Sequence, residues 1–157
     1  MFVHSSKFLT PCPEDNQLQP NATDITIDRL FKIDSESTFY LSKNSKQSKE
    51  THEITPVIDD RSNVSWVLEP GQYEFESMYF CEIPAQTVGW LIGRSTLNRS
   101  GIFVASGLYD SGFKGHVGGT IYCFGPALIE QGTRIAQLVT CTAESINLYQ
   151  GQYQYGK

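Results

Sequence analysis

Short stretches of this chain alternate between apolar and polar residues. In residues 24–28, Asp24, Thr26 and Asp28 alternate with two isoleucines, and residues 72–76 alternate in the same way. Successive side chains of a strand point to opposite faces, so this period of two predicts half-buried β-strands.

Further short apolar runs follow, separated by Pro, Gly and other turn residues. After position 64 they cover residues 65–68, 79–83, 88–92, 102–105, 117–124 and 135–141. No ten-residue stretch has the spacing of an amphipathic helix, and only residues 96–100 suit a helical turn. The pattern predicts an all-β fold with at most one or two short helical turns: an antiparallel sandwich, a distorted jelly roll or a small β-barrel.

Three segments depart from this strand pattern. Residues 1–17 are interrupted by prolines and polar residues, which predicts an N-terminal arm outside the core. Residues 34–53 are rich in Ser, Lys, Gln and Glu, which predicts a hairpin with a mobile, solvated loop. Residues 149–157 predict a mobile tail that either closes over a ligand or simply frays. We expect one domain over residues 1–157.

The composition narrows the class of protein. Hydrophobic residues make up 39% of the chain, enough for a globular core. The first residues lack an apolar stretch of signal-peptide length, so an intracellular protein is expected. The four cysteines lie far apart in the sequence without metal-ligand spacing, and Cys81, Cys123 and Cys141 are expected to be small core residues. His4 and His52 have no partner pattern.

The charge distribution favours a small anionic ligand. The net charge of −5 argues against a nucleic-acid polymer as partner. Residues 1–89 hold 7 Lys and Arg against 14 Asp and Glu, whereas residues 90–157 hold 5 against 3. The positive charge is therefore concentrated in the second half of the chain, where a phosphate-bearing ligand would be attracted.

One candidate anion site lies between Gly93 and Gly101. Arg94 and Arg99 supply guanidinium groups, whose planar donors match phosphate oxygens, and Ser and Thr hydroxyls lie between them. The bounding glycines allow a close backbone approach to a ligand. Taken alone, the stretch fits a polar surface loop equally well.

A second candidate lies in residues 106–115, which combine three glycines with Asp110 and Phe113. A tight hairpin there can present backbone groups to a ligand, while the carboxylate accepts a proton and the ring packs on a ring. An ordinary turn in which Asp110 binds backbone amides is the alternative. Arg134 and Gln137 are polar exceptions near an apolar run, although such residues often lie on a wet strand face.

Taken in order, four segments resemble motifs of the dUTPase and dCTP deaminase superfamily. Residues 18–24 are similar to the deaminase "QPxSxD" segment, and residues 93–101 to its "GRSSLARxG" motif. Residues 108–115 resemble the shared "IDPGFxG" motif, and residues 132–138 resemble "GxRIxQL". Their order carries the resemblance, which runs from about Leu18 to the end and is weakest between positions 34 and 63.

The resemblance implies a dUTPase-like fold and an enzyme of deoxynucleotide metabolism. It implies a deoxynucleoside triphosphate substrate, dUTP or dCTP, and a homotrimer whose active sites are assembled from neighbouring subunits. It also implies Mg²⁺ held mainly by the substrate phosphates, without direct protein ligands. No nucleic-acid or membrane partner is expected, and the expected location is the cytoplasm, or the host cytoplasm if the protein is viral.

Two departures distinguish the branches of this superfamily. The deaminase branch has a proton-transferring glutamate five residues after the "GFxG" glycine, and Thr120 stands there in this chain. A threonine hydroxyl does not shuttle protons near neutral pH. Asp110 corresponds to the dUTPase carboxylate that positions the attacking water. The glycine-rich tail motif of typical dUTPases is absent, and residues 149–157 resemble a shortened deaminase tail.

The leading hypothesis is a dUTP diphosphatase that forms dUMP and pyrophosphate. One alternative is a dCTP deaminase, either monofunctional or bifunctional and dUMP-forming, in which Glu130 or another acid replaces the missing glutamate. Another is a non-catalytic deoxynucleotide-binding regulatory homologue. The resemblance assigns the water-positioning role to Asp110. It assigns phosphate binding to Arg94, Ser95, Thr96, Arg99 and Gln137. It assigns base or sugar binding to Gly107, Leu108, Tyr109 and Phe113, and site support to Asp24, Arg134 and Tyr153.

Overall fold

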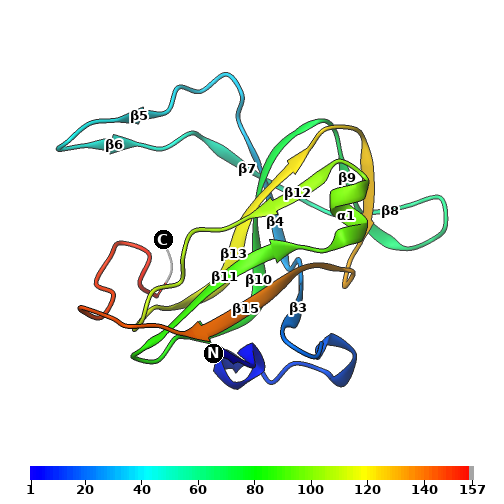
Figure 1. Ribbon diagram of the computed structural model, residues 1–157. Helices are drawn as coiled ribbons and strands as arrows, with labels where there is room; N and C mark the ends of the chain where they lie inside the picture. Colours follow the sequence, from blue (N-terminus) through cyan, green and yellow to red (C-terminus); the bar gives the residue numbers. More distant parts are fainter. Residues whose placement is uncertain (156–157) are drawn as a thin grey trace.

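The computed structural model describes residues 1–155, and β-strands dominate it (Figure 1). Every strand pairing in this part of the chain is antiparallel. The all-β prediction is confirmed. The strands form four open sheets and no closed barrel within the described residues.

The largest sheet is built on two long central strands, β10 and β13. Its strands are β12 (Ile102–Ala105), β13 (Lys114–Cys123), β10 (Gly71–Glu82), β4 (Arg29–Ile33) and β7 (Thr51–Ile54), in that order, and β2 (Leu9–Thr10) also pairs with β10. Along β10, Tyr73 and Phe75 are buried while Gln72 is exposed. The period of two predicted for residues 72–76 is therefore confirmed.

The second sheet contains Asp24, Arg134 and Gln137, and its strand β11 (Thr87–Gly93) ends immediately before Arg94. Its central strand β15 (Arg134–Thr142) pairs with β11, β1 (Phe2–Val3) and β3 (Thr23–Thr26). A smaller sheet holds β14 (Ala127–Glu130), β9 (Val64–Leu68) and β8 (Val57–Ile58). β5 (Tyr40–Leu41) and β6 (Lys46–Gln47) form a separate hairpin.

The sheets share one hydrophobic core. Its fully buried side chains come from all three larger sheets and include Ile25, Leu30, Trp66, Leu68, Tyr73, Phe75, Val117, Ile121, Ile135 and Leu138. Cys81 and Cys123 are also buried, as predicted, whereas Cys141 is half-buried. Burial raises the pKa of the Cys81 thiol to about 12, so this side chain stays protonated near neutral pH.

The helical content is slightly larger than predicted. The predicted turn at residues 96–100 is the short helix α1 (Ser95–Arg99). Two 3₁₀ turns, η1 (Ser5–Phe8) and η2 (Asp15–Gln17), were not expected. None of the helices in residues 1–155 has the length and apolar character needed to cross a membrane.

The N-terminal segment belongs to the core, and the expectation of an arm outside it is wrong. β1 pairs with β15, and the side chains of Ser5 and Leu9 are buried. The hydroxyl of Ser5 donates to Thr23 Oγ1 at 2.8 Å and lies 2.7 Å from the carbonyl oxygen of Leu138. Strands of only two residues show no period, so the sequence pattern missed them.

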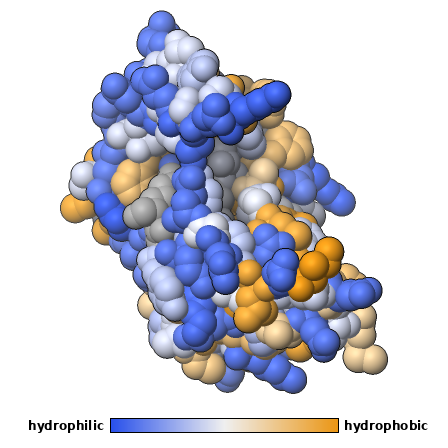
Figure 2. Space-filling view, turned by 90° about the vertical axis from the view of Figure 1, so that its left-hand side faces the viewer, coloured by the Kyte–Doolittle hydropathy of each residue, from blue (hydrophilic) through white to orange (hydrophobic). Residues whose placement is uncertain are grey.

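The hairpin predicted in residues 34–53 is confirmed as β5–β6, which projects from the upper left of the molecule in Figure 1. Figure 2 views that side and shows a mostly hydrophilic upper part. The described part of the tail, residues 149–155, folds back on the chain through Tyr149 N–H, which donates to the Ser111 carbonyl at 2.7 Å. The last two residues of the predicted tail lie outside the described residues.

Candidate functional site

Asp24 is the centre of a buried polar cluster. Strand register pairs it with Gln137, whose Nε2 donates to Asp24 Oδ1 at 3.0 Å. Gln19 Nε2 donates to Asp24 Oδ2 at 3.1 Å. The side chain of Asp24 is 0% exposed. A buried carboxylate is tolerated only with such partners, because it has lost its hydration.

Two arginines complete this cluster. Arg134 Nη1 lies 3.2 Å and Arg94 Nε 3.7 Å from Asp24 Oδ2. Arg94 Nη1 also donates to the Arg134 carbonyl at 3.2 Å, and Arg134 Nη1 donates to the Asn16 carbonyl at 2.7 Å. The arginine side chains remain 30% and 37% exposed. Two guanidinium groups against one carboxylate leave positive charge facing solvent, as phosphate binding requires.

Helix α1 follows Arg94 and presents free donors. Ser95, Thr96 and Arg99 are exposed, and their side chains form no hydrogen bond or ion pair with other residues in 1–155. A groove of about 330 Å³ runs beside this helix, and Thr96 and Glu130 are among its lining residues. The predicted phosphate-binding residues therefore lie on or next to α1 and in the first half of β15.

Asp110 lies in a second region. Tyr109 forms an isolated bridge with Gly89, with backbone hydrogen bonds of 2.7 and 3.0 Å. The next residue, Asp110, is exposed, and its carboxylate makes no hydrogen bond or ion pair within the described chain. The alternative in which Asp110 binds nearby backbone amides is thus not observed. Gly107 and Leu108 are also exposed.

Tyr109 and Phe113, both predicted to contact base or sugar, pack into the core. Each is 7% exposed, and their ring centroids lie 5.1 Å apart. The Tyr109 hydroxyl donates to the Gly118 carbonyl, and burial raises the pKa of this phenol. Little of either ring is accessible, so in this conformation the exposed backbone and Leu108 are the surfaces available to a ligand.

The two regions lie at opposite ends of β11. Gly89 is bridged to Tyr109, and Arg94 follows the last residue of the strand. The five residue-to-residue steps from Gly89 to Arg94 span about 17 Å at the rise of an extended strand. One chain therefore brings Arg94, Arg134, Gln137 and Asp24 together but does not bring Asp110 to them.

The described tail associates with the Asp110 region. Gln154 Nε2 donates to the Gly112 carbonyl at 2.9 Å, and Lys114 N–H donates to Gln154 Oε1 at 3.0 Å. Tyr153 accepts a hydrogen bond from Lys46 Nζ at 3.0 Å. Gly112 has a φ of +87°, and a Cβ there would lie 2.9 Å from Leu148 Cβ, so this turn requires glycine.

Sequence reasoning missed two amides of this arrangement, Gln19 and Gln154. Gln19 lies in the segment that resembles the deaminase motif, but its contact with Asp24 depends on the turn between them.

Thr120 lies in the middle of β13, where its partner on β10 is Glu74. Cross-strand partners share a face, so Glu74 is the acid that this register places beside Thr120.

A family model for dCTP deaminase-like proteins matches residues 3–142. The chain belongs to the dCTP deaminase-like family. Among its relatives, a probable deoxyuridine 5'-triphosphate nucleotidohydrolase of Halobacterium salinarum is 30% identical over 90% of this chain and 85% of its own length. One of the same name from Methanopyrus kandleri is 31% identical over 92% of each chain. A dUMP-forming dCTP deaminase of Corynebacterium jeikeium is 32% identical over 91% of this chain and 77% of its own.

Solved structures support the fold of this dCTP deaminase-like protein. The dCTP deaminase of Agrobacterium tumefaciens matches 87% of this chain with a TM-score of 0.63 and 15% identity. This chain covers only 44% of that longer one. The dUTPase of Staphylococcus bacteriophage 80alpha, solved with dUpNHpp, matches 89% of this chain and 80% of its own with a TM-score of 0.54 and 20% identity.

Proposed function

We propose that this dCTP deaminase-like protein is a dUTP diphosphatase, which hydrolyses dUTP to dUMP and pyrophosphate. The observation that carries the proposal is the free, exposed carboxylate of Asp110, combined with Thr120 in the position of the deaminase glutamate. The relatives from Halobacterium salinarum and Methanopyrus kandleri, named as probable dUTP-hydrolysing enzymes, support it.

In the proposed reaction, Asp110 accepts a hydrogen bond from a water molecule and directs it at the α-phosphorus. The water oxygen forms a new P–O bond in line with the bond between the α-phosphorus and the oxygen bridging to the β-phosphate. That bond breaks as pyrophosphate leaves, and Asp110 takes up the proton that the water loses. The groups that would hold the phosphate oxygens are Arg94, Ser95, Thr96 and Gln137, with Arg99 and Arg134 as further donors. Asp24 fixes Arg94, Arg134 and Gln137 before substrate binds.

The chemistry of the donor set agrees with a substrate-held magnesium ion. Guanidinium and amide donors surround Asp24, so its carboxylate is not available to a cation. Bound Mg²⁺ would be held mainly by the phosphates and would neutralise their charge.

The base-binding part of the proposal rests on the exposed backbone between Gly107 and Asp110. Its N–H and C=O groups can form hydrogen bonds with the uracil edge. Tyr109 and Phe113, each only 7% exposed, support this backbone from the core side. Tyr153 and its neighbours in the tail would limit access of water.

We propose a homotrimer whose sites combine residues of neighbouring copies. Asp110 has to lie at the α-phosphorus while the arginines bind adjacent phosphates, yet about 17 Å of strand separates the two regions within one chain. A second copy of the chain would supply the missing half. Such an enzyme would act on the cytoplasmic nucleotide pool.

Glu74 is the observation that favours a second candidate, dCTP deamination. Glu74 lies beside Thr120 on the neighbouring strand. From there its carboxylate could act on a bound nucleotide in place of the glutamate that the deaminase branch has at the position of Thr120. The Corynebacterium jeikeium relative is named a dUMP-forming dCTP deaminase.

Product analysis separates these functions. The protein is incubated with Mg²⁺ and either dUTP or dCTP, and the nucleotides are resolved by anion-exchange chromatography. We expect dUMP and pyrophosphate from dUTP, and unchanged dCTP. Formation of dUTP or dUMP from dCTP that is lost in Glu74→Gln would favour the deaminase. Tight binding of dUTP without turnover of either dUTP or dCTP would contradict both enzymes and favour a regulatory homologue.

A further inference from the structure

A second polar group lies at the root of the β5–β6 hairpin, away from the Asp24 cluster. Asp34 follows the end of β4, and Glu50 and His52 lie at the start of β7. Asp34 N–H donates to the Glu50 carbonyl at 2.9 Å, which continues the pairing of the two strands. Glu50 and His52 are two residues apart on a strand, so their side chains share a face.

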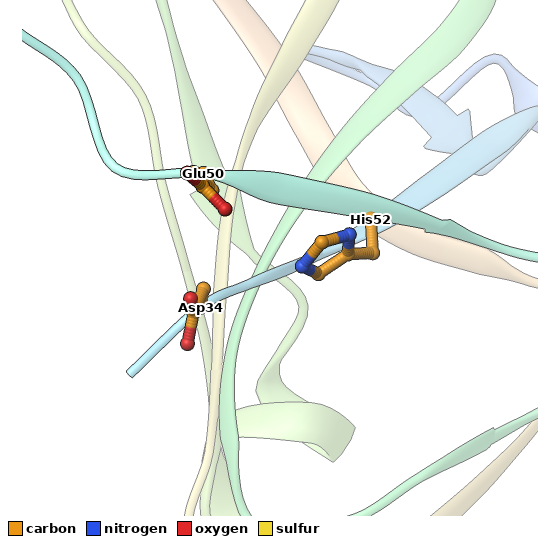
Figure 3. Close-up of side chains that lie close together, drawn as sticks. All are labelled: Asp34, Glu50 and His52. Atoms are coloured by element: carbon orange, nitrogen blue, oxygen red, sulfur yellow. The ribbon is translucent and has the colours of Figure 1, made fainter. Parts of the chain in front are cut away.

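The three side chains converge on one point. One ligand atom from each of Asp34, Glu50 and His52 can be chosen so that all lie within 4.8 Å of one another. Figure 3 shows the edge of the His52 ring directed toward the gap between the two carboxylates. Within residues 1–155, this is the one group of three His, Cys, Asp or Glu side chains with such spacing.

No Lys or Arg side chain in residues 1–155 forms an ion pair with the carboxylates of Asp34 and Glu50. Lys49 Nζ donates to the backbone carbonyls of Asp34 and Ser35, at 3.2 and 3.3 Å, and forms no ion pair with either carboxylate in the described structure. Lys32, the strand partner of His52, pairs with Glu69 at 2.9 Å. Two carboxylates held close together without a counter-ion repel each other, and a bound cation would relieve that repulsion.

We propose that Asp34, Glu50 and His52 bind a divalent first-row transition metal, with zinc as the best match. An imidazole ligand disfavours Mg²⁺ and Ca²⁺, which prefer sites made only of oxygens. Three protein ligands and one water complete the four-coordinate geometry of zinc, and the exposure of Glu50 and His52 leaves room for that water. The site is independent of the proposed nucleotide chemistry.

The bound metal fastens the root of the hairpin. It links the end of β4 to the start of β7, where the chain leaves and re-enters the large sheet. The hairpin between these points carries Lys43, Lys46 and Lys49, three sites at which trypsin cleaves. Metal binding therefore slows cleavage at these lysines, since proteolysis requires local opening of the chain.

Isothermal titration of the full chain, stripped with EDTA, with ZnCl₂ tests the site. We expect saturable binding of one zinc ion per chain, unaffected by excess MgCl₂. Loss of a residue that only supports a metal ligand weakens metal binding about 10- to 100-fold. His52→Gln and Glu50→Gln each remove a direct ligand, so each should weaken zinc binding by at least this factor. His116→Gln, an exposed histidine on β13, is the matched control and should leave binding unchanged.

Trypsin digestion with and without zinc provides the second readout. Zinc should slow cleavage after Lys43, Lys46 and Lys49 in the original chain and have no effect in His52→Gln, which also controls for any effect of zinc on trypsin. Absent zinc binding, or binding unchanged in both ligand variants, overturns the site. Zinc binding without slower cleavage overturns the fastening of the hairpin.

Discussion

Asp24 and Asp110 are the same residue type in opposite surroundings. Asp24 is fully buried and contacts two amides and two guanidinium groups, whereas Asp110 is exposed and its carboxylate has no partner in residues 1–155. The Asp24 carboxylate holds other side chains in place through hydrogen bonds and ion pairs. The second keeps its lone pairs free for a water molecule. The comparison separates a preorganised binding half from a chemically free half.

The largest expected effect concerns the free half. Asp110→Asn removes the proposed general base, so dUTP turnover should fall by about 10²- to 10⁴-fold. The melting temperature should be unchanged, because the carboxylate makes no contact that stabilises the fold. Initial rates of pyrophosphate release and thermal melting measure the two quantities. Glu144→Gln, another exposed acid, is the control. An Asp110→Asn variant that retains full turnover would remove the assigned role.

Substitution of Asp24, in the preorganised half, should lower the stability of the fold. Asp24→Asn leaves two guanidinium groups close together without their counter-charge, and we expect a loss of about 2–3 kcal/mol in the free energy of unfolding, less than for fully enclosed pairs because both arginines reach solvent. Urea denaturation measures it. Asp28→Asn, an exposed aspartate four residues further on, should have little effect. Equal losses in the two variants would contradict the central role of Asp24.

A smaller effect is expected where the tail supports the Asp110 region. Gln154→Ala removes two hydrogen bonds to residues 112 and 114, so KM for dUTP should rise about two- to fivefold with little change in kcat. Steady-state kinetics of this variant and of the exposed control Gln152→Ala would show the difference. A normal KM in Gln154→Ala would mean that the tail contributes nothing to substrate binding.

The smallest effect concerns an exposed ion pair beside the same region. Lys114 Nζ lies 3.2 Å from Glu82 Oε2, and this hydrogen bond and charge raise the pKa of Lys114. A raised pKa means that the stabilisation is complete below about pH 10.4, the ordinary lysine value, and is lost as the pH rises through the higher folded value. The small difference in melting temperature between the original chain and Lys114→Gln should therefore vanish at strongly alkaline pH.

Salt should distinguish this pair from the Asp24 cluster. Exposed charges are screened by salt, whereas buried ones are screened much less. Added NaCl should remove the difference in stability between Lys114→Gln and the original chain. The difference in stability between Asp24→Asn and the original chain should remain largely unchanged. The reverse result would mean that the two regions do not differ in burial as described.

Local features could be predicted from the sequence because they depend on neighbours in the chain. The period of two placed Tyr73 and Phe75 inside, and the polar turn after Arg94 was identified as helical. Phe113 shows the limit of such reasoning, since an aromatic residue in a glycine-rich turn suits a ligand contact and a core position equally. The structure places it in the core.

Long-range pairing could not be predicted. Gln137 and Asp24 are 113 residues apart, and an alternating pattern reports which face is buried but not which strand lies beside it. For the same reason, the sequence pattern could not predict that Glu74 lies beside Thr120. His52 received no partner because the hairpin separates it from Asp34 in sequence while bringing the two together in space. The sequence motifs nevertheless assigned site roles to Arg94, Arg134 and Gln137, which are all the side chains that contact the Asp24 carboxylate in residues 1–155 apart from Gln19.

Complementation between two inactive variants tests most directly the claim that the two halves work together across copies. Asp110→Asn and Arg94→Ala are purified separately, checked for folding by thermal melting, then unfolded, mixed in equal amounts and refolded together, and dUTP hydrolysis is measured. If each site takes Asp110 from one copy and Arg94 from another, random assembly restores about one quarter of the sites and hence about one quarter of the original activity. Mixtures no more active than either variant alone would contradict a shared site.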